Sequence, residues 1–423
     1  MNYIDMIIKK LTMSNNVFLT GGAGVGKTTL TNQIIKYFED EAKKVVKLAS
    51  TGMAATLIGG QTLHSFFDLG IVSNLDELEK KGKLETSKKI KKLIKSMDLL
   101  IVDEISMVSD TLLEMIEYRL ISSEFNGAIL VVGDFLQLPP IARSFSEVRF
   151  AFESPAWKRF DFYTVELTHI YRTRDTDFIK LLNSVRFAHI DENTHNKLNE
   201  YIRPIPECLN EFTFLFGKNI SASLHNKKQL SFIDSELFIK EAKIIKHQKN
   251  ITDKDIQRFM DDARIERKLE LKIDAPVLFT RNSWNYFNGE KGRVVNVDDE
   301  YLYIQKNDGK IIKLDSVAQS KTKWIEKDTD GVKEFVEEEV FTIYQYPIKL
   351  AFAITIHKSQ GMSIEDLIIE TNEIFAPSQF YVALSRCSNP KRLNLIAPKK
   401  QWHSLAFVNH KALDFVRGKN IPK

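Results

Sequence analysis

The segment Val17–Thr29 places the strongest constraint on how this chain can fold. A short apolar run, Val17–Thr20, leads into a glycine-rich loop that ends in Lys27 and Thr28. The spacing is G-x-x-x-x-G-K-[ST], which joins a buried strand to a helix. The glycines let the backbone curl, so that its N–H groups and the positive end of the helix can hold phosphate oxygens. The sequence therefore predicts a site for the phosphates of a nucleotide.

Each polar residue of this loop has an expected task. Lys27 is expected to reach the β- and γ-phosphates, and the hydroxyl of Thr28 is expected to bind Mg²⁺. The expected nucleotide-binding residues are Gly22, Ala23, Gly24, Val25, Gly26, Lys27, Thr28 and Thr29.

The composition sets broad limits on the class of protein. The chain has 423 residues and a formal net charge of +4, which by itself does not establish nucleic-acid binding. The two cysteines, Cys208 and Cys387, lack metal-ligand spacing, so a disulfide framework or zinc site is not expected. The N-terminal segment is too short and too charged for a secretory leader, and no apolar run reaches about 18 residues. We therefore expect a cytoplasmic protein without a membrane segment.

Short apolar runs alternate with helical patterns along much of the chain. Runs that are apolar at nearly every position suit strands buried on both faces, as in a parallel sheet covered by helices. Such runs lie at 45–49, 99–102, 128–132, 212–216, 367–369, 380–383 and 393–396. We therefore expect an α/β fold with two parallel-sheet domains, and ligands at the carboxyl edge of the first sheet.

Two segments interrupt this pattern. Residues 68–97 are polar, helical in spacing and rich in lysine, which indicates an insertion in the first domain. Such a charge run is usually a solvated helix face, and the alternative is an arm that touches phosphates. Residues 275–342 have a β pattern with an Asn-Asp-Gly turn, which predicts a small antiparallel barrel inserted in the second domain. Residues 233–271 are charged and irregular, and give no clear pattern.

Two carboxylates follow the apolar run at 99–102. Asp103 is placed to hold Mg²⁺, directly or through water, and Glu104 to orient and deprotonate an attacking water. Acidic residues at a strand end are common, so the pair is informative only because a phosphate loop precedes it. Asp134 and Gln137 follow the apolar run at 128–132, where a strand is expected to lead into a loop. Their side chains could contact the γ-phosphate and report its presence. The alternative there is an ordinary proline turn.

Two arginines lie outside the first domain, Arg172 in HIYRT and Arg386 in ALSRC. A planar guanidinium from across a cleft can stabilise charge on a phosphoryl group during its transfer. For one arginine a surface ion pair would be the better interpretation, but two in a nucleotide-binding chain favour a role in hydrolysis. Gln360 also suits a contact to the γ-phosphate or to water.

Two further segments suit the phosphates and bases of a nucleic-acid strand, because they combine hydroxyl, histidine, aromatic and basic residues. The alternative for Phe66 and Phe67 is core packing, and we expect at least one of them in the core. The candidates for strand contacts are Thr51, Gly52, Met53, His64, Ser65, Phe66, Thr355, His357 and Lys358.

Together these segments resemble the motifs of superfamily 1 helicases, and more narrowly those of the Pif (petite integration frequency) family, which is related to the RecD and Dda types. The segments are, in order, GGAGVGKTTL, ASTGMAATLIGGQTLHSF, LLIVDEISMVS, VVGDFLQLPP, ELTHIYRTRDTDFIKLLNSVRF, AITIHKSQGMSIEDLIIE and YVALSRCSNPKRL. Recognisable motifs extend from about Val17 to about Leu395, which is nearly the whole chain.

The resemblance implies two RecA-like domains in tandem with the nucleotide between them. Domain 1A would span 1–170, with a lysine-rich wedge, 1B, at about 68–97, and signature helices with a connector would occupy 171–210. Domain 2A would comprise 211–284 and 343–423, with an SH3-like insertion, 2B, at 285–342.

The resemblance also implies an ATP-dependent DNA helicase that moves 5′ to 3′ on single-stranded DNA and unwinds duplexes, with ATP and Mg²⁺ as cofactors. The implied catalytic residues are Lys27, Glu104, Gln137, Arg172, Gln360 and Arg386, and the implied metal ligands are Thr28 and Asp103. Partners would be single-stranded DNA and forks. G-quadruplex DNA and roles in replication, repair, recombination or telomere-type maintenance are family associations. We expect a monomer of the bacterial or phage type, associated with the nucleoid.

The chain departs from the family pattern in three places. No glutamine precedes the phosphate loop, and the nearest one, Gln33, follows it, so the residues that read adenine are not identified. Thr173 stands where the family often has glutamine. Long terminal extensions are absent from the sequence.

Two other functions stay open at this stage. One is a nucleotide-switched protein that binds or tracks single-stranded nucleic acid without productive unwinding. Glu104 and the two arginines argue against it, because a switch need not hydrolyse quickly. The other is action on RNA, since nothing in the sequence identifies a contact to a 2′-hydroxyl.

Overall fold

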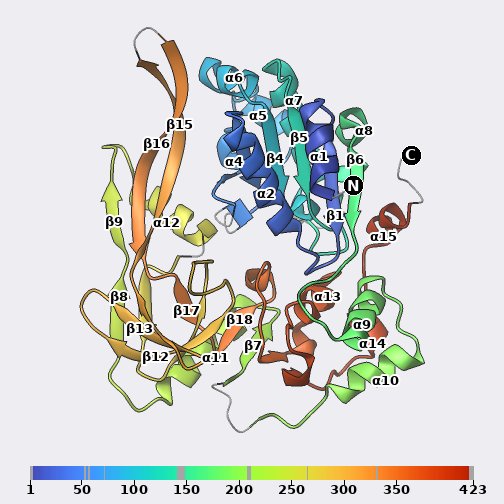
Figure 1. Cartoon of the computed structure of the whole chain (residues 1–423), viewed down its shortest axis with the longest axis vertical. Helices are drawn as coiled ribbons and strands as arrows, with labels where there is room; N and C mark the ends of the chain where they lie inside the picture. The colour runs from blue at the N-terminus through green and yellow to red at the C-terminus, as the bar shows by residue number, and fades with distance from the viewer. Residues whose placement is uncertain are drawn as a thin grey trace. The chain divides into compact units, whose positions relative to one another are not determined.

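Figure 1 presents a computed structural model of the chain. It describes residues 3–51, 54–55, 58–70, 72–140, 148–206, 211–263, 265–329 and 332–418. The described residues belong to two compact units. Unit 1 takes them from Met1–Tyr171, Thr322–Glu338 and Lys411–Lys423, and unit 2 from Arg172–Lys321 and Glu339–His410.

Unit 1 is built on a six-stranded sheet with the order β3-β2-β4-β5-β1-β6. The strands are β1 (Val17–Gly21), β2 (Val45–Ala49), β3 (Gln61–Thr62), β4 (Leu99–Asp103), β5 (Ala128–Val132) and β6 (Tyr163–Leu167). Every pair in the sheet is parallel. β1 and β5 are buried at every position and β4 at all but its last, as expected for central strands covered on both faces. The carboxyl ends of β1, β4 and β5 therefore lie at one edge of the sheet.

Helices cover this sheet. They are α1 (Tyr3–Thr12), α2 (Lys27–Asp40), α4 (Leu63–Phe66), α5 (Leu75–Lys80), α6 (Lys88–Lys95), α7 (Asp110–Ser122), α8 (Pro155–Phe160) and α15 (His410–Val416), with short turns η1 (Ile105–Met107) and η2 (Ala151–Glu153). α1 and α2 bury Ile7, Ile34 and Phe38 against the sheet in one apolar cluster. Within the described ranges, no helix has the length and apolar character needed to cross a membrane.

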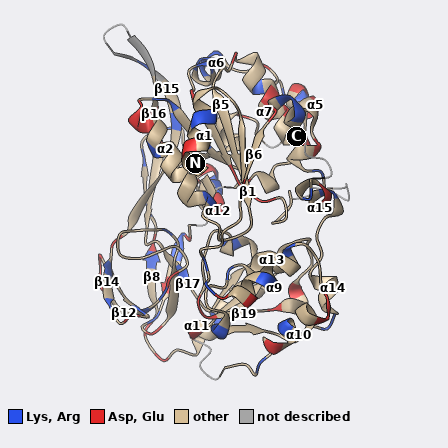
Figure 2. Cartoon of the chain, turned by 45° about the vertical axis from the view of Figure 1, so that its right-hand side comes forward, with Lys and Arg blue, Asp and Glu red and all other residues tan. Residues whose placement is uncertain are grey.

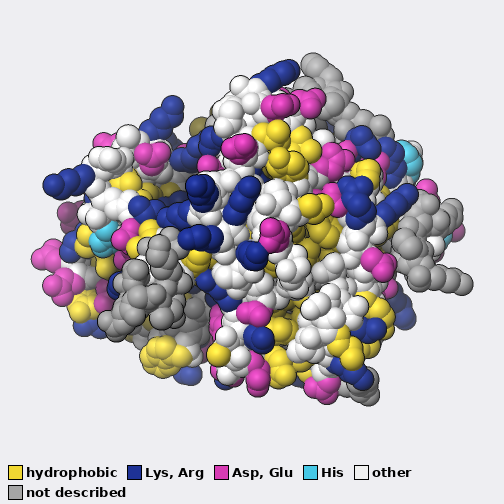
Figure 3. Space-filling view, turned by 90° about the horizontal axis from the view of Figure 1, so that it is seen from above, with side chains coloured by type: hydrophobic (Ala, Val, Ile, Leu, Met, Phe, Trp, Pro, Cys, Tyr) yellow, Lys and Arg dark blue, Asp and Glu magenta, His cyan; other side chains and the backbone are white. Residues whose placement is uncertain are grey.

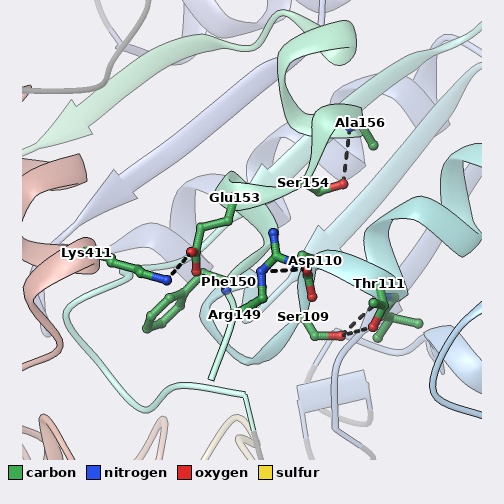
Figure 4. Close-up of polar contacts among 10 residues, drawn as sticks. Ser109, Asp110, Thr111, Arg149, Phe150, Glu153, Ser154, Ala156 and Lys411 are labelled. Atoms are coloured by element: carbon green, nitrogen blue, oxygen red, sulfur yellow. Dashed lines mark hydrogen bonds and ion pairs between the residues drawn. The ribbon is translucent and has the colours of Figure 1, made fainter. Parts of the chain in front are cut away.

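The C-terminal helix α15 packs on unit 1 through Phe415. Its ring stacks on Phe152 with centroids 4.3 Å apart and lies 5.3 Å from Phe135, which follows β5. Lys411 donates to Glu153 at 2.8 Å, and Glu153 also accepts the backbone N–H of Phe150 (Figure 4). From the family resemblance we expected residues 343–423 in the second domain. The contacts of α15 instead place Lys411 and the described residues after it in unit 1.

Unit 2 contains a second parallel sheet, with the order β18-β7-β19-β20. The strands are β7 (Thr213–Phe216), β18 (Ala353–Thr355), β19 (Leu367–Ile369) and β20 (Leu393–Leu395), and all pair in parallel. Around them lie α9 (Thr176–Arg186), α10 (Glu192–Glu200), α11 (Asn219–Ser231), α13 (Gln379–Leu384), α14 (Trp402–Leu405), η4 (His357–Ser359), η5 (Thr371–Glu373) and η6 (Pro390–Arg392). The expectation of two parallel-sheet α/β domains is confirmed.

The prediction of a strand at residues 380–383 in unit 2 is wrong. Residues 380–383 form part of α13, whose six residues are all buried. A short apolar run is compatible with a buried strand and with a buried helix, and periodicity alone does not separate the two.

The remaining strands are largely antiparallel and lie mostly in unit 2, except that Thr322–Glu338 belong to unit 1. Five strands, in the order β14-β13-β12-β11-β17, form one sheet, and β15-β16-β9 and β10-β8 form two smaller ones. The bounds are β8 (Phe238–Glu241), β9 (Lys243–Lys246), α12 (Asp253–Ala263), β10 (Lys268–Leu271), β11 (Pro276–Phe279), β12 (Lys291–Val297), β13 (Leu302–Lys306), β14 (Ile311–Leu314), β15 (Val317–Thr329), β16 (Val332–Gln345) and β17 (Ile348–Leu350). The Asn-Asp-Gly turn joins β13 to β14, with Gly309 at φ +83°. The five-stranded sheet thus uses residues on both sides of the 285–342 insertion expected from the sequence.

The lysine-rich segment forms the short helices α5 and α6. α6 buries Leu93 and Ile94, and its lysines are exposed along the rest of the helix (Figure 2). Figure 3 shows the molecule from above, which is the side on which α6 lies in Figure 1. Acidic side chains are interspersed with Lys and Arg on this face. Lys95, for example, pairs with Glu124. This face is therefore mixed in charge rather than uniformly basic.

The packing of α15 predicts that Phe415→Ala will destabilise unit 1. Removing a buried aromatic ring from a core costs about 3–5 kcal/mol of unfolding free energy, and Phe415 is 5% exposed. Urea unfolding of the full chain, followed by circular dichroism, measures the loss. The matched control is Ile121→Ala, since Ile121 is 69% exposed and its removal should change stability by less than about 0.5 kcal/mol. Equal stability of the two variants would contradict the assignment of α15 to this core.

Candidate functional site

The glycine-rich loop connects β1 to α2. Gly24 and Gly26 have φ angles of +78° and +88°, a region that glycine enters at little cost. The loop turns tightly there and leads into the N-terminus of α2. The Nζ of Lys27 donates to the carbonyl oxygens of Gly21 at 2.7 Å and Gly22 at 2.9 Å, so the ammonium group lies over the loop. This arrangement can hold phosphate oxygens through backbone N–H groups, a helix N-terminus and one lysine.

Tyr171 also contacts this loop, and the sequence did not single it out. Its backbone N–H donates to the carbonyl of Gly24 at 2.8 Å, and a Cβ on Gly26 would lie 3.7 Å from its ring. The side chain is 72% exposed, with the ring of His169 edge-on at 4.5 Å. The neighbouring Arg172 drew attention to this segment, and only the fold brings the tyrosine to the loop.

Asp103 and Glu104 lie at the carboxyl end of β4. Glu104 adopts φ +53°, and its backbone N–H donates to Oδ1 of Asp103 at 2.8 Å. Its carbonyl accepts from the hydroxyl of Ser50 at 3.1 Å, which ties the turn to the end of β2. Burial, followed by the negative charge of Glu104, raises the pKa of Asp103 to about 7, while the N–H of Glu104 and the charge of Lys27 oppose the rise. The pair therefore lies within the electrostatic reach of the phosphate loop.

The oxygen donors at this edge fit Mg²⁺. Across the part of the chain that the structure describes, no group of three or more His, Cys, Asp or Glu side chains could hold a metal ion by itself. Mg²⁺ in nucleotide sites uses one or two protein oxygens and completes its shell with phosphate oxygens and water. Thr28 supplies a hydroxyl oxygen and Asp103 carboxylate oxygens, so this hard-oxygen set matches that requirement.

Asp134 and Gln137 follow β5 at the same edge. Oδ1 of Asp134 accepts the N–H of Leu136 at 3.1 Å, and its carbonyl accepts the N–H of Gln137 at 2.8 Å. The side-chain amide of Gln137 is 3.5 Å from Oδ2 of Asp134, and both side chains are buried. Asp134 thus shapes the turn that positions Gln137, and the adjacent Phe135 anchors the turn in the aromatic cluster of α15.

Unit 2 brings Arg172 and Arg386 into one hydrogen-bonded cluster. Arg172 donates from Nε to the hydroxyl of Ser363 at 2.9 Å and from a terminal nitrogen to the carbonyl of Ser385 at 2.6 Å. Arg386 donates to the hydroxyl of Ser385 at 2.8 Å and to the carbonyl of Ser359 at 3.3 Å. The two arginines therefore share Ser385, although 213 residues separate Arg172 from that serine.

Burial sets the properties of this cluster. It lowers the pKa of Arg172 to about 10, so the guanidinium remains charged at neutral pH. Gln360, next to Ser359, is 8% exposed, and its Nε2 donates no hydrogen bond to any described residue. A buried donor without a partner is costly, so this amide is suited to a ligand oxygen.

The candidates for strand contacts in unit 1 are only partly accessible. Thr51 accepts the N–H of Ala54 at 3.3 Å, while Gly52 and Met53 lie outside the described residues. His64 and Ser65 are partly exposed. Phe66 is 5% exposed and packs edge-on against the buried Phe67 at 4.9 Å. Both phenylalanines are therefore core residues, in agreement with the expectation that at least one of them is.

The corresponding turn in unit 2 presents two of its three candidates. Thr355 is 3% exposed, and its hydroxyl accepts the N–H of Lys358 at 3.3 Å, which shapes the turn. His357 is partly exposed and Lys358 is exposed. Thr355 thus supports the turn from inside, and the other two side chains reach the surface.

Comparisons with known proteins agree with these features. Residues 2–196 match the model of the PIF1-like helicase family. The chain is 38% identical over 425 residues to the ATP-dependent DNA helicase Pif1 of Campylobacter jejuni, across 96% of this chain and 94% of the relative. A solved structure of Bacteroides sp Pif1 with ADP-AlF4 matches with a TM-score of 0.83 and 30% identity, covering 99% of this chain and 96% of that one. Bacteroides Pif1 bound to ssDNA matches with a TM-score of 0.63 and 29% identity, covering 98% and 96%. The chain therefore belongs to the PIF1-like family of ATP-dependent DNA helicases.

Proposed function

We propose that this helicase moves 5′ to 3′ on single-stranded DNA and opens duplexes at forks, using ATP and Mg²⁺ bound at the phosphate loop. The observation that carries the proposal is the carboxyl edge of the unit 1 sheet, where Lys27, Asp103 and Glu104 follow β1 and β4. The related Bacteroides Pif1 bound to ssDNA supports a single strand as the track.

In unit 1, the residues of the loop bind the nucleotide. Lys27 would exchange the carbonyls of Gly21 and Gly22 for oxygens of the β- and γ-phosphates. Backbone N–H groups from Gly22 to Thr29 hold the remaining phosphate oxygens. Thr28 and Asp103 are the residues that would hold Mg²⁺, which when bound neutralises phosphate charge.

The hydrolytic step is assigned to the ends of β4 and β5. Glu104 orients the attacking water and accepts its proton. Gln137, held by Asp134, contacts the γ-phosphate or that water. The aromatic anchor of the same turn keeps Gln137 in place as the nucleotide changes.

In unit 2, we assign Arg172 and Arg386 to the charge that develops on the γ-phosphate, and Gln360 to a contact with its oxygen. The two arginines belong to one hydrogen-bonded cluster, and Gln360 is next to Ser359 of that cluster in the chain, so all three would respond together to the state of the nucleotide. If each unit grips the strand in turn, with Thr51, His64 and Ser65 on one and His357 and Lys358 on the other, each cycle advances the protein.

Lys27→Ala should abolish DNA-stimulated ATP hydrolysis. Loss of one preorganised charge at the transferring group lowers the rate by about 10²–10³-fold, and phosphate release assays with and without single-stranded DNA measure it. Lys36→Ala, on the exposed side of α2, is the matched control and should keep the full rate. Stimulated hydrolysis that survives in Lys27→Ala would refute the assignment of the loop.

Glu104→Gln should separate nucleotide binding from hydrolysis. The amide keeps the size of the side chain but does not accept the proton of water, so kcat should fall by about 10²–10⁴-fold with little change in ATP affinity. Single-turnover hydrolysis and binding of a fluorescent ATP analogue give the two values, and Glu41→Gln on the surface is the control. A variant that hydrolyses normally would remove Glu104 from the mechanism.

The direction of movement is tested by tailed duplexes. The protein with ATP should displace a strand from a duplex with a 5′ single-stranded tail and leave a 3′-tailed duplex closed. Tails of DNA and of RNA in the same assay decide between the two nucleic acids. Opening from the 3′ tail alone would refute the direction. Brisk ATP turnover with neither duplex opened would instead identify a nucleotide-driven switch or translocase.

A further inference from the structure

The loop between β11 and β12 presents two large aromatic side chains to solvent. Trp284 is 93% exposed and Phe287 is 67% exposed, while Tyr286 between them is buried. Single exposed apolar residues are common on protein surfaces. Two within four residues, one of them a nearly fully exposed tryptophan, call for a physical reason.

This loop is well held, so the exposure does not follow from a lack of structure. Tyr286 stacks on Phe279 with centroids 4.3 Å apart and an interplanar angle of 14°. The N–H of Ser283 donates to the carbonyl of Tyr286 at 2.8 Å, and the N–H of Phe287 donates to Glu290 at 3.0 Å. The loop therefore has a defined conformation in which Trp284 and Phe287 point away from the core.

The base of the loop sits against the turn that carries His357 and Lys358. Gly289 has φ +87°, and a Cβ there would lie 2.7 Å from the carbonyl oxygen of Ser363, so only glycine permits this close approach. Ser363 in turn accepts from Arg172 at 2.9 Å. The two aromatic residues thus belong to a loop that packs directly on a proposed strand-contact turn.

The charges around this place suit an anionic strand. Lys358 is exposed on the turn against which Gly289, at the base of the loop, packs through Met362 and Ser363. Arg281 begins the aromatic loop and donates to the carbonyl of Ala318. Exposed aromatic rings next to basic residues form the combination that binds single strands, because bases stack on the rings and cations attract the phosphates.

We propose that Trp284 and Phe287 form a base-stacking site for single-stranded DNA on unit 2. The inference rests on the proposed function, and it adds to the strand path two residues that no motif identifies. Stacking is tolerant of base identity, since every base has a π-face, which suits a protein that moves along any sequence. The loop that carries the two rings packs on Ser363 through Gly289, and Ser363 accepts a hydrogen bond from Arg172.

Oligonucleotide binding without nucleotide tests the site. Anisotropy of fluorescein-labelled oligo-dT should show that Trp284→Ala weakens binding by about 5- to 150-fold. The double variant Trp284→Ala/Phe287→Ala should bind more weakly still. Trp284→Phe should keep most of the affinity. Phe232→Ala, which removes another exposed aromatic ring of unit 2, is the matched control and should bind like the unaltered protein.

An abasic oligonucleotide of the same length separates stacking from phosphate contacts. The unaltered protein should bind it as weakly as the double variant does, and the double variant should bind both oligonucleotides equally. Tryptophan emission gives a second readout, because two of the four tryptophans, Trp157 and Trp402, are buried and Trp284 is not. Oligo-dT should quench the emission of the unaltered protein, and Trp284→Phe should lose that quenching.

The outcomes distinguish this inference from the function on which it rests. Binding of oligo-dT by the unaltered protein, with equal affinity in the double variant, would overturn the stacking site and leave the function intact, with the aromatic pair assigned to another partner. Equal losses on abasic and normal oligonucleotides would also overturn stacking. Failure of the unaltered protein to bind oligo-dT would instead overturn the proposed function. Unchanged circular dichroism and DNA-independent ATP hydrolysis establish that the variants are folded.

Discussion

The parallel pairing of β4, β5 and β1 is the constraint on which the nucleotide site depends. Because the three strands run in one direction, their carboxyl ends meet at one edge, where Lys27, the Asp103–Glu104 pair and Gln137 follow them. Nearly every residue of these strands is inaccessible to solvent, as expected for strands in the middle of a sheet that is covered on both faces. A phosphate loop on an isolated hairpin would have the glycines but not the acidic residues that make hydrolysis possible.

Unit 2 concentrates its chemistry in one turn, residues 357–363. Ser359 accepts from Arg386, Ser363 accepts from Arg172, and the carbonyl of Ser363 lies against Gly289 of the aromatic loop. The partly exposed His357 and the exposed Lys358 belong to the same turn. One short segment therefore contacts both arginines that we propose to sense the γ-phosphate, and it carries two residues that we propose to hold the strand. In this proposal the segment would link nucleotide state to strand binding.

Features carried by local patterns could be predicted from the sequence. The phosphate loop follows from its glycine spacing, the central strands from continuous apolar runs, and the turn at Gly309 from Asn-Asp-Gly. Features that depend on contacts between distant segments could not. The buried run in α13 has no periodicity that separates helix from strand, and Tyr171 reaches the loop only through the fold. Phe66 is buried and Trp284 is exposed, although both are large aromatic residues. This difference in exposure depends on the segments that pack around each residue, not on residue type.

The central proposal is that the arginines of unit 2 sense a nucleotide bound at the phosphate loop of unit 1. Fluorescence energy transfer between labels at Lys36→Cys and Ser223→Cys, both exposed, measures it most directly in a chain with Cys208 replaced by serine. Burial raises the pKa of Cys387 to about 12, so that thiol will not compete for the labels. The account predicts that ADP-AlF4 changes the transfer efficiency, and that Lys27→Ala and the double variant Arg172→Ala/Arg386→Ala both lose this change. A transfer efficiency that nucleotide leaves unaltered, or a change that persists without the two arginines, would contradict it.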